Sequence, residues 1–455
     1  MKTTRRLGLL STVGALVIGV GAAADDTATG ADGAPPRDTI TVYGTSNPMP
    51  VFTYPGQVSV VTREDVLTFA PSAVSDLLRD LPGVEMGGGP RRTGETPSLR
   101  GFGRDNVLVL LDGARQSFTS GHDGSFFLDP GLVKSAEAVR GPAAALYGSG
   151  AMGGVLAFET IDAGDVLAPG EAFGAQARAG YQSANEESLV SLTAVTRHGV
   201  FDGVASIGRR DSSDITLGSG FELPSDDDVF TALLKSSYGF AEGVEGQASW
   251  QRFRNEAVEP DNGQGVSVAD DSEVFNQVAK TTTSDTYRLG FDIAPPTVGW
   301  LDADVTLYRA ETEVDEEDPV SGRITTRAID TTGVRFAERM DFALGAATHV
   351  VTIGGEAYRD EQHGGDDAAD DGVRAGVPDA QSDFAGAFVQ LETTLPRPLG
   401  LPGELVVIPG VRWDRFESDA DAFEGTNEDE AVSPRIGASY APAPWFVAFA
   451  SWGEA

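Results

Sequence analysis

Cysteine is absent from the 455-residue chain. Its absence excludes disulfide scaffolds, zinc-thiolate sites and cysteine nucleophiles. Basic residues are also few, because 33 Lys and Arg stand against 69 Asp and Glu, for a formal net charge of −36. Since phosphate contacts need Lys and Arg, we do not expect a nucleic-acid partner. The common catalytic signatures (Ser-x-x-Lys, His-Glu-x-x-His, a nucleophile elbow) are missing too, so we do not expect an enzyme.

Long hydrophobic runs are also lacking, because no apolar stretch reaches the roughly 20 residues that a membrane-spanning helix needs. The longest, residues 7–20, follows a basic start that includes Lys2 and Arg5, and it precedes the small residues 22–24. These three marks predict a secretory signal peptide over residues 1–24, with a single membrane anchor as the alternative. The exported chain is then either a soluble protein or an outer-membrane barrel.

The segment after the predicted cleavage site, residues 25–55, is interpreted as a linker. Residues 25–36 are Asp, Thr, Gly, Ala and Pro, which offer nothing to bury, so disorder is expected there. Residues 38–44 alternate β-branched side chains and favour a short strand. Such a segment either adds to an exposed sheet edge of a partner or is the first strand of the next domain, and the pattern leaves both open.

Residues 56–168 are typical of one compact α/β domain. Residues 58–61 and 108–111 predict strands, and residues 63–81 predict two short helices, with Thr62 capping the first and Ser72 the second. Residues 132–139 favour another strand or a short helix. The glycine-rich residues 146–155 permit tight turns and close approach of neighbouring walls. A phosphate-binding loop is the alternative there, but no Lys-Ser/Thr follows the glycines.

From about residue 171 the pattern changes to recurrent strand-like segments of roughly 9–13 residues, each alternating apolar and polar side chains. Short connections, such as residues 198–199, alternate with long acidic ones, such as 256–280 and 360–383. This alternation is expected of a membrane barrel with plain inner turns and elaborate outer loops. A soluble all-β repeat protein is the alternative. The acidic loops also raise the possibility of Ca²⁺ binding, although such runs are more often solvated surface.

Several of these segments resemble the N-terminal region of TonB-dependent outer-membrane receptors. Residues 38–44 are similar to the family's TonB box, which pairs with the energy-coupling protein TonB, and the box residues are Asp38, Thr39, Ile40, Thr41 and Val42. Motifs of the family's plug domain match at residues 98–102, 110–116, 139–142 and 146–155. The motif positions that we expect to shape or gate the plug are Arg100, Gly101, Asp112, Gly113, Arg140, Gly141, Gly148, Gly150, Gly153 and Gly154.

The resemblance implies an α/β plug domain (residues 56–168) inside an antiparallel transmembrane β-barrel that begins near residue 169. A complete barrel of this kind has about 22 strands, and roughly 13 strand-like segments are present up to residue 455. We therefore expect the sequence to be C-terminally truncated. An open arc of strands leaves an unpaired edge in lipid, so the fragment is not expected to form a stable transporter alone.

Within that family, residues 121–130 look most like the plug of haem and haemoglobin receptors. There, a histidine at the position of His122 sits on the outward apex of the plug and is one of two axial ligands of haem iron. Neutral imidazole is a good iron ligand, and the flanking glycine favours exposure. The second ligand is expected beyond Ala455. His198, His349 and His363, the other histidines, are weaker candidates, with the first two on the inner side.

The resemblance therefore implies a receptor that transports haem as its ligand and holds no permanent cofactor. The implied partners are TonB, haem or haemoglobin, and outer-membrane lipid, and a monomer is expected. Uptake of a ferric siderophore by the same architecture is one alternative. A passive porin or a surface adhesin is another, from a different class, and it predicts activity that does not depend on residues 38–44.

Overall fold

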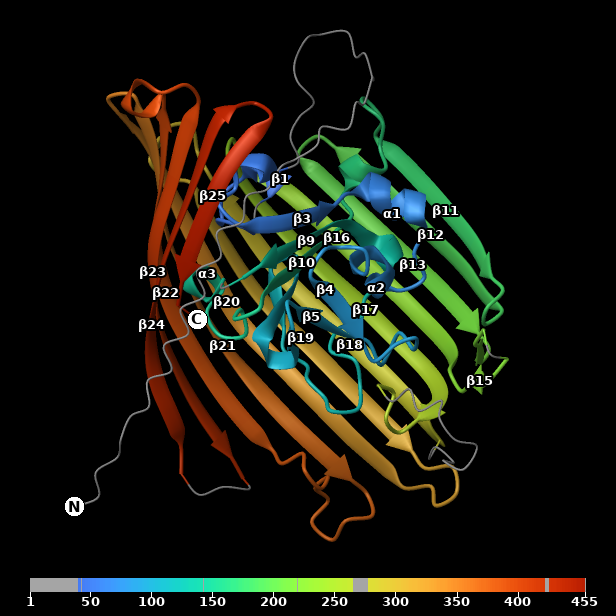
Figure 1. The fold of residues 1–455 in the computed structure, drawn as a ribbon. Helices are drawn as coiled ribbons and strands as arrows, with labels where there is room; N and C mark the ends of the chain where they lie inside the picture. Colours follow the sequence, from blue (N-terminus) through green and yellow to red (C-terminus); the bar gives the residue numbers. More distant parts are fainter. Residues whose placement is uncertain are drawn as a thin grey trace, which may run out of the picture.

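The computed structural model describes residues 40–41, 43–141, 143–218, 220–264, 277–421 and 425–454. The predicted signal peptide and three TonB-box residues, Asp38, Thr39 and Val42, lie outside the described residues. Figure 1 shows the two parts of the molecule, a small mixed α/β unit and a large curved sheet that wraps around it.

The small unit, here called the plug, is built on a five-stranded sheet in the order β3-β9-β10-β7-β8. A three-stranded sheet β4-β5-β6 and a two-stranded sheet β1-β2 lie beside it. The strands are β1 (Ile40–Thr41), β2 (Met49–Pro50), β3 (Gln57–Val61), β4 (Val84–Gly87), β5 (Thr96–Leu99), β6 (Phe102–Gly103), β7 (Val107–Leu111), β8 (Ala114–Gln116), β9 (Val133–Arg140) and β10 (Gly154–Thr160). The helices are α1 (Arg63–Phe69), α2 (Val74–Leu78), α3 (Ala144–Tyr147), and the 3-10 turns η1 (Val51–Thr53), η2 (Arg104–Asn106), η3 (Pro130–Leu132) and η4 (Ala163–Asp165).

The two predicted helices are present, but only one of their predicted caps is. Thr62 caps α1, accepting a hydrogen bond from the backbone N of Asp65, whose carboxylate binds the backbone N of Thr62 in return. The prediction that Ser72 caps α2 is wrong, because Ala73 is the N-cap residue. Asp76 satisfies this helix start instead, since its carboxylate accepts from the backbone N atoms of Ser72 and Ala73. A carboxylate in the first turn also suits the helix dipole.

The central strand β7 explains how the plug is held on both faces. All five of its residues are buried, and alternate side chains point to opposite faces of the sheet. Val107, Val109 and Leu111 join the core that contains α1 and α2. Leu108 and Leu110 join a second core that includes Phe388 and Ile408 of the large sheet. The plug sheet is therefore packed on both faces against helices of the plug and side chains of the large sheet, which are Val195, Val204 and Leu233 in the first core.

The large sheet has 13 antiparallel strands in sequence order, β11-β12-β13-β16-β17-β18-β19-β20-β21-β22-β23-β24-β25. They are β11 (Phe173–Gln182), β12 (Glu187–His198), β13 (Phe201–Ser212), β16 (Asp226–Ala241), β17 (Val244–Pro260), β18 (Gln277–Ile293), β19 (Ala303–Glu317), β20 (Ile324–Leu344), β21 (Ala347–Asp366), β22 (Ala380–Pro396), β23 (Glu404–Ala420), β24 (Asn427–Ala443) and β25 (Phe446–Gly453). The short pair β14 (Ile215–Thr216) and β15 (Glu222–Leu223) lies between β13 and β16, and η5 (Pro398–Gly400) precedes β23. In the described sheet β11 and β25 are the edge strands and do not pair with each other.

Alternation along each strand separates a plug-facing from an outward-facing side. On β17, for example, Gln251, Phe253 and Asn255 are buried, whereas Arg254 and Glu256 on the other face are exposed. Two-residue turns at 199–200, 242–243, 345–346 and 444–445 join strands at one end. Connections of 6 to 16 residues at 213–225, 261–276, 318–323 and 367–379 join them at the other, here called the loop end.

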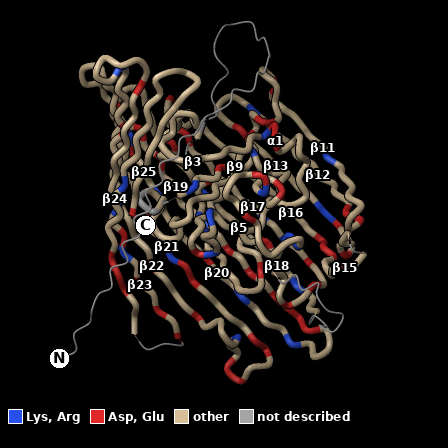
Figure 2. Tube along the Cα trace, viewed as in Figure 1, with Lys and Arg blue, Asp and Glu red and all other residues tan. Residues whose placement is uncertain are grey.

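The barrel strands are longer than predicted, reaching 21 residues in β20 and 20 in β21. Part of the predicted loop 360–383 is therefore strand, because β21 continues to Asp366 and β22 begins at Ala380. Near the loop end the outward side chains are charged, as in the ion pair Arg359–Asp383. Apolar/polar alternation disappears where both faces are polar, although the backbone ladder continues. Figure 2 shows charged residues along the strands near the loop end.

Candidate functional site

The loop between β8 and η3, residues 117–129, carries the candidate site at its tip. Ser120 shapes this tip, because its Oγ accepts from the backbone N of His122 at 3.1 Å and from that of Asp123 at 3.0 Å. The same hydroxyl donates to the Asp123 carboxylate at 2.7 Å. The resulting turn exposes His122 while it buries Asp123. Among the described residues, the His122 imidazole has no hydrogen-bond partner.

The tip is fastened to the large sheet on both sides of His122. Asp123 Oδ1 lies 2.8 Å from Nζ of Lys280, on β18. Gln264, in the connection between β17 and β18, donates its backbone N to the His122 carbonyl at 2.9 Å. Its side-chain amide donates to the carbonyls of Ser120, at 3.0 Å, and of Asp123. The backbone of His122 is therefore held in place while its side chain stays accessible.

Lys280 joins three neighbouring strands beneath the tip. Its ammonium lies 3.3 Å from Glu259 of β17 and 3.4 Å from Glu316 of β19, and its side chain is 1 % exposed. Thr93 of the plug also donates to both oxygens of Glu259, at 3.2 and 3.0 Å. A buried cation with three carboxylates is stable only while the set is complete.

A cavity of about 190 Å³ opens beside His122 at the loop end. It is lined by residues of three connections and of the strand ends next to them. The lining residues are His122, Asp261, Val278, Glu316, Asp318, Arg323, Thr325, Arg374 and Ala375. His122 thus shares one cavity with two arginines from different loops. The loop end around this cavity is otherwise rich in carboxylates (Figure 2).

The backbone of residues 93–95 supports the tip from the plug side. The backbone N atoms of Gly124 and Ser125 donate to the carbonyls of Thr93 and Glu95. Burial raises the pKa of the Glu95 carboxyl to about 7, although a hydrogen bond from Ser75 acts in the opposite direction. Glu95 thus combines a buried carboxyl with a backbone carbonyl that accepts from the tip.

The other three histidines lie away from His122. His198 ends β12 at a two-residue turn, and His349 is near the start of β21, at the same end of the sheet. The His349 ring stacks on Phe342 and bonds Thr393 Oγ1 at 3.0 Å. His363 is at the loop end but belongs to strand β21 rather than to a loop, and its Nδ1 lies 2.7 Å from Asp379. None of the three lines the cavity of His122.

The described part of the N-terminal segment is paired within the chain. Ile40 and Thr41 form β1, which pairs with β2. The buried carboxylate of Glu137, on β9, accepts from Thr41 Oγ1 at 2.5 Å and from the backbone N of Tyr43 at 3.2 Å. Tyr147 donates its hydroxyl to the Tyr43 carbonyl at 3.0 Å. The described residues Ile40 and Thr41 thus form an internal strand, while pairing of residues 38–44 with a partner stays a prediction.

Two of the plug motifs are hairpin turns. Arg100-Gly101 joins β5 to β6 and Asp112-Gly113 joins β7 to β8, and in both pairs φ is positive at both residues. Two-residue hairpin loops of this kind match the twist of the strands, and Gly adopts the conformation without strain. The Asp112 carboxylate also accepts from the Thr160 backbone N at 2.8 Å.

The remaining motif residues are placed around the same plug core. Arg140, at the end of β9, donates to Ser59 at 2.7 Å. Gly141, Gly148, Gly150 and Gly154 have positive φ, while Gly153 lies where an added Cβ would meet Phe102. None of the predicted motif residues lines the cavity of His122. They shape the plug itself.

Two buried ion-pair groups between plug and sheet were not found from the sequence. Arg92 binds Glu187 of β12 and Asp227 of β16, while Arg210 of β13 binds Asp129 of the plug at 2.8 Å. In the second group, Arg115 binds Glu356 of β21 at 2.9 Å and lies over the Tyr358 ring. The sequence feature that could have identified these residues is a charged side chain at an inward-facing position of a strand, where the alternation predicts small polar side chains.

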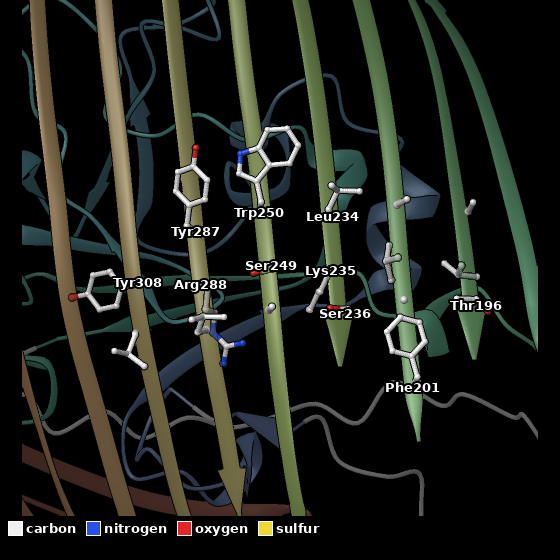
Figure 3. A pocket seen from close by; sticks show the side chains of 18 of the residues that line it. Thr196, Phe201, Leu234, Lys235, Ser236, Ser249, Trp250, Tyr287, Arg288 and Tyr308 are labelled. Atoms are coloured by element: carbon white, nitrogen blue, oxygen red, sulfur yellow. The ribbon is translucent and has the colours of Figure 1, made fainter. Parts of the chain in front are cut away.

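A hollow of about 860 Å³ is on the opposite face of the sheet. Phe201, Leu234, Trp250 and Tyr287 project there on the side away from the plug (Figure 3). Leu234 is 52 % exposed and Tyr287 41 %. An open apolar surface on the outside of a barrel suits lipid chains rather than a polar substrate.

In the part of the chain that the structure describes, no cluster of three or more His, Cys, Asp or Glu side chains is arranged to hold a metal ion. Within the same residues, no helix is both long enough and apolar enough to span a bilayer.

Two family models match the chain. Residues 50–155 match the TonB-dependent receptor plug domain, and residues 209–455 match the TonB-dependent receptor-like β-barrel. The hemin receptor of Yersinia pestis is 32 % identical over 419 residues, which are 92 % of this chain and 60 % of that protein. A heme/hemopexin utilization protein C of Haemophilus influenzae is 25 % identical over 457 residues, again 92 % of this chain and 62 % of the relative. The chain thus spans about three fifths of the length of these relatives.

Solved structures share the fold. The Serratia marcescens hemophore receptor HasR, solved with its hemophore HasA and heme, superposes with a TM-score of 0.76 at 18 % identity. That match covers 89 % of this chain and 64 % of HasR. The FrpB iron transporter of Neisseria meningitidis gives a TM-score of 0.74 at 22 % identity, covering 86 % of this chain and 64 % of FrpB.

Proposed function

Because this chain belongs to the family of TonB-dependent receptors, with both plug and barrel sequences, we propose that it functions in an outer-membrane receptor for haem uptake. We assign residues 1–24 to an export signal, 25–55 to a linker with the TonB box, 56–168 to the plug and 169–455 to the barrel. The relatives named for hemin and for heme/hemopexin utilization support haem as the ligand.

The observation that carries the proposal is the placement of His122. Its side chain is exposed at the tip of a plug loop whose backbone is fixed by Lys280 and Gln264. A fixed backbone with an accessible imidazole suits axial ligation of haem iron, which uses an unprotonated ring nitrogen. His122 is therefore our iron ligand.

Coupling to TonB would run through β9. This strand begins just after the loop that carries His122 and Asp129, and it holds Glu137, to which Thr41 is bound. If haem favours a plug state in which the contact between Thr41 and Glu137 is weaker, residues 38–44 become available in the periplasm as a strand for TonB. Such a population shift requires haem to bind that state better than the resting one.

The outward face of the sheet supports a place in the outer-membrane lipid. Exposed apolar side chains follow its strands, including Leu192, Ile207, Leu234, Leu289 and Leu307. Charged pairs such as Arg359–Asp383 follow toward the loop end. An apolar band that gives way to charge is the surface expected at a membrane boundary.

Hemin titration of the purified full-length receptor tests the ligand. We expect a shift of the Soret band that His122→Ala abolishes or strongly weakens. His363→Ala is the matched control, because His363 is also exposed at the loop end but pairs with Asp379 outside the cavity, and it should bind hemin like the wild type. A wild type without a Soret shift would overturn the haem proposal, and an unchanged His122→Ala spectrum would overturn the role of His122.

Deletion of residues 38–44 separates active uptake from a passive porin or an adhesin. We expect the deletion to abolish growth on hemin as the iron source while it leaves hemin binding unchanged. Undiminished growth on hemin would contradict TonB coupling. Growth of the wild type on a ferric siderophore but not on hemin would favour the siderophore alternative.

A further inference from the structure

Two arginines converge on the cavity of His122, although acidic residues outnumber basic ones by 69 to 33 in the chain. Arg323 ends the connection between β19 and β20, and Arg374 lies in the connection between β21 and β22. Residues this far apart in sequence reach one small cavity only because the loop end brings their connections together. Their positive charge is opposite to that of most charged residues at the loop end.

Arg374 has a donor with nothing to bind. One of its nitrogens, Nη2, donates to Glu316 at 2.6 Å. Its Nη1 is buried and has no hydrogen-bond partner among the described residues. A buried N–H without an acceptor is costly, and such groups call for a specific explanation. An acceptor that arrives with a ligand would provide one.

The carboxylates that line the cavity are already engaged. Glu316 accepts from Arg374 and Thr325 and lies 3.4 Å from Lys280. Asp318 accepts from the backbone N atoms of Val320 and Ser321, at 2.8 and 2.9 Å. Asp261 accepts from the backbone N of Asn262 at 2.7 Å. Each of these carboxylates thus already holds at least one donor. Within the described part of the chain, Oε1 of Glu316 has no hydrogen bond but lies 3.4 Å from the Lys280 ammonium, whereas Nη1 of Arg374 has no acceptor.

Arg323 supplies further donors at the rim. It binds Asp366 through Nε, at 2.9 Å, and through Nη2, which uses two of the five N–H groups of a guanidinium. Its side chain is 48 % exposed, so the rest of the guanidinium can face an incoming group. Planar guanidinium groups match carboxylates in geometry as well as charge.

We propose that Arg374, assisted by Arg323, binds a carboxylate of the ligand whose iron is held by His122. This inference rests on the proposed function and specifies it: the receptor recognises the acidic side groups of the porphyrin as well as its iron. The cavity, about 190 Å³, is smaller than the roughly 300–1,000 Å³ of pockets that enclose a whole ligand. It therefore takes only the carboxylate edge of the macrocycle.

Hemin and hemin dimethyl ester, in which both carboxylates are esterified, separate this site from iron ligation. Each is titrated into the full-length receptor and followed by the Soret band. The wild type should bind hemin at least tenfold more tightly than the diester, as expected for loss of one charge-assisted hydrogen bond. Arg374→Gln should lower the ratio of the affinities for hemin and diester toward one, while it leaves the affinity for the diester unchanged. His122→Ala should weaken both ligands together.

Two further variants keep the test decisive. Arg359→Gln removes an exposed arginine of β21 that pairs with Asp383 outside the cavity, and it should keep the wild-type preference. Arg374→Lys retains the positive charge but lacks the planar guanidinium group. It should restore part of the preference for hemin over the diester. Equal affinity of the wild type for hemin and diester, or an unchanged preference in Arg374→Gln, would overturn the carboxylate site and leave haem uptake standing. A wild type that shifts neither Soret band would overturn the proposed function itself.

Discussion

Asp123, the residue directly after the exposed His122, is paired with the buried Lys280 across 2.8 Å. The pair links the tip of a plug loop to the inner wall of the large sheet, and Glu259 and Glu316 bring two more strands to the same ammonium. A flexible loop would have to be ordered when a ligand arrives, which costs free energy. The anchor removes that cost before binding.

Replacement of Lys280 tests this anchor. Lys280→Met removes a cation shared by three buried carboxylates, of which Glu316 keeps its pair with Arg374, and breaking such a set costs about 3–5 kcal/mol. We expect the loop 117–129 to become sensitive to protease and the hemin Soret shift to weaken. Lys134→Met is the control, because its pair with Asp162 is about 40 % exposed and contributes less than about 1 kcal/mol. Wild-type protease resistance in Lys280→Met would contradict the anchor.

Glu95 predicts a dependence of stability on pH. Its pKa is about 7 in the folded plug against an ordinary 4.5, so the folded state retains the proton longer than the unfolded state does. Stability therefore falls as pH rises from about 4.5 to 7, and at about 1.4 kcal/mol per pKa unit the loss is on the order of 3–4 kcal/mol. Glu95→Gln should remove this loss and unfold at a higher temperature than the wild type at pH 8.

The comparison at pH 4 is the internal control for Glu95. Both the wild type and Glu95→Gln are then uncharged at this position, so their unfolding temperatures should be nearly equal. Gln retains an oxygen that can accept from Ser75, which keeps the packing comparable. An equal difference between the two proteins at pH 4 and pH 8 would exclude a role for this ionisation.

Arg92 predicts how firmly the plug is held. Its guanidinium is buried between Glu187 and Asp227, so Arg92→Met leaves buried carboxylates short of a partner, at a cost of about 3–5 kcal/mol. Hydrogen exchange of residues 72–95 should become faster. Arg197→Gln removes the exposed pair with Asp202 and should leave exchange in this segment unchanged. Equal exchange in both variants would show that the buried pairs do not hold the plug.

Much of the fold was accessible from the sequence because its signals are local. Thr62 with Asp65 marks a helix start, and Asp112-Gly113 marks a hairpin, whatever surrounds them. Alternation placed the barrel strands but not their loop-side ends. There, Arg359 and its neighbours continue the ladder without an apolar face, and the pattern that marks a strand is lost.

The site was only partly accessible, because its partners come from distant segments. His122 was singled out by its resemblance to a family motif, but Lys280, Gln264 and Arg374 were not. Lys280 lies 157 residues along the chain from Asp123, and their contact depends on which strand faces which plug loop. No local pattern encodes that pairing. Charges at inward strand positions were the only hint.

The contact of Thr41 with Glu137 predicts how the N-terminal segment is released. Glu137→Gln keeps the shape but removes the charge from the hydrogen bonds to Thr41 and Tyr43. Charge-assisted hydrogen bonds exceed neutral ones by about 1 kcal/mol each, so opening of β1 should become at least about tenfold more frequent. Because the chain has no cysteine, Ile40→Cys provides a unique thiol, and its rate of maleimide labelling measures that opening.

The matched control is Glu159→Gln on the neighbouring strand β10. Glu159 binds Ser135 rather than the N-terminal segment, so labelling of Ile40→Cys should proceed as in the unsubstituted background. If ligand binding acts by weakening the contact with Glu137, saturating hemin should increase the labelling rate of the protein that retains Glu137. In Glu137→Gln, where that contact is already weakened, hemin should increase the rate little further. Labelling that is equally slow in Glu137→Gln and Glu159→Gln would show that β1 is retained by other contacts.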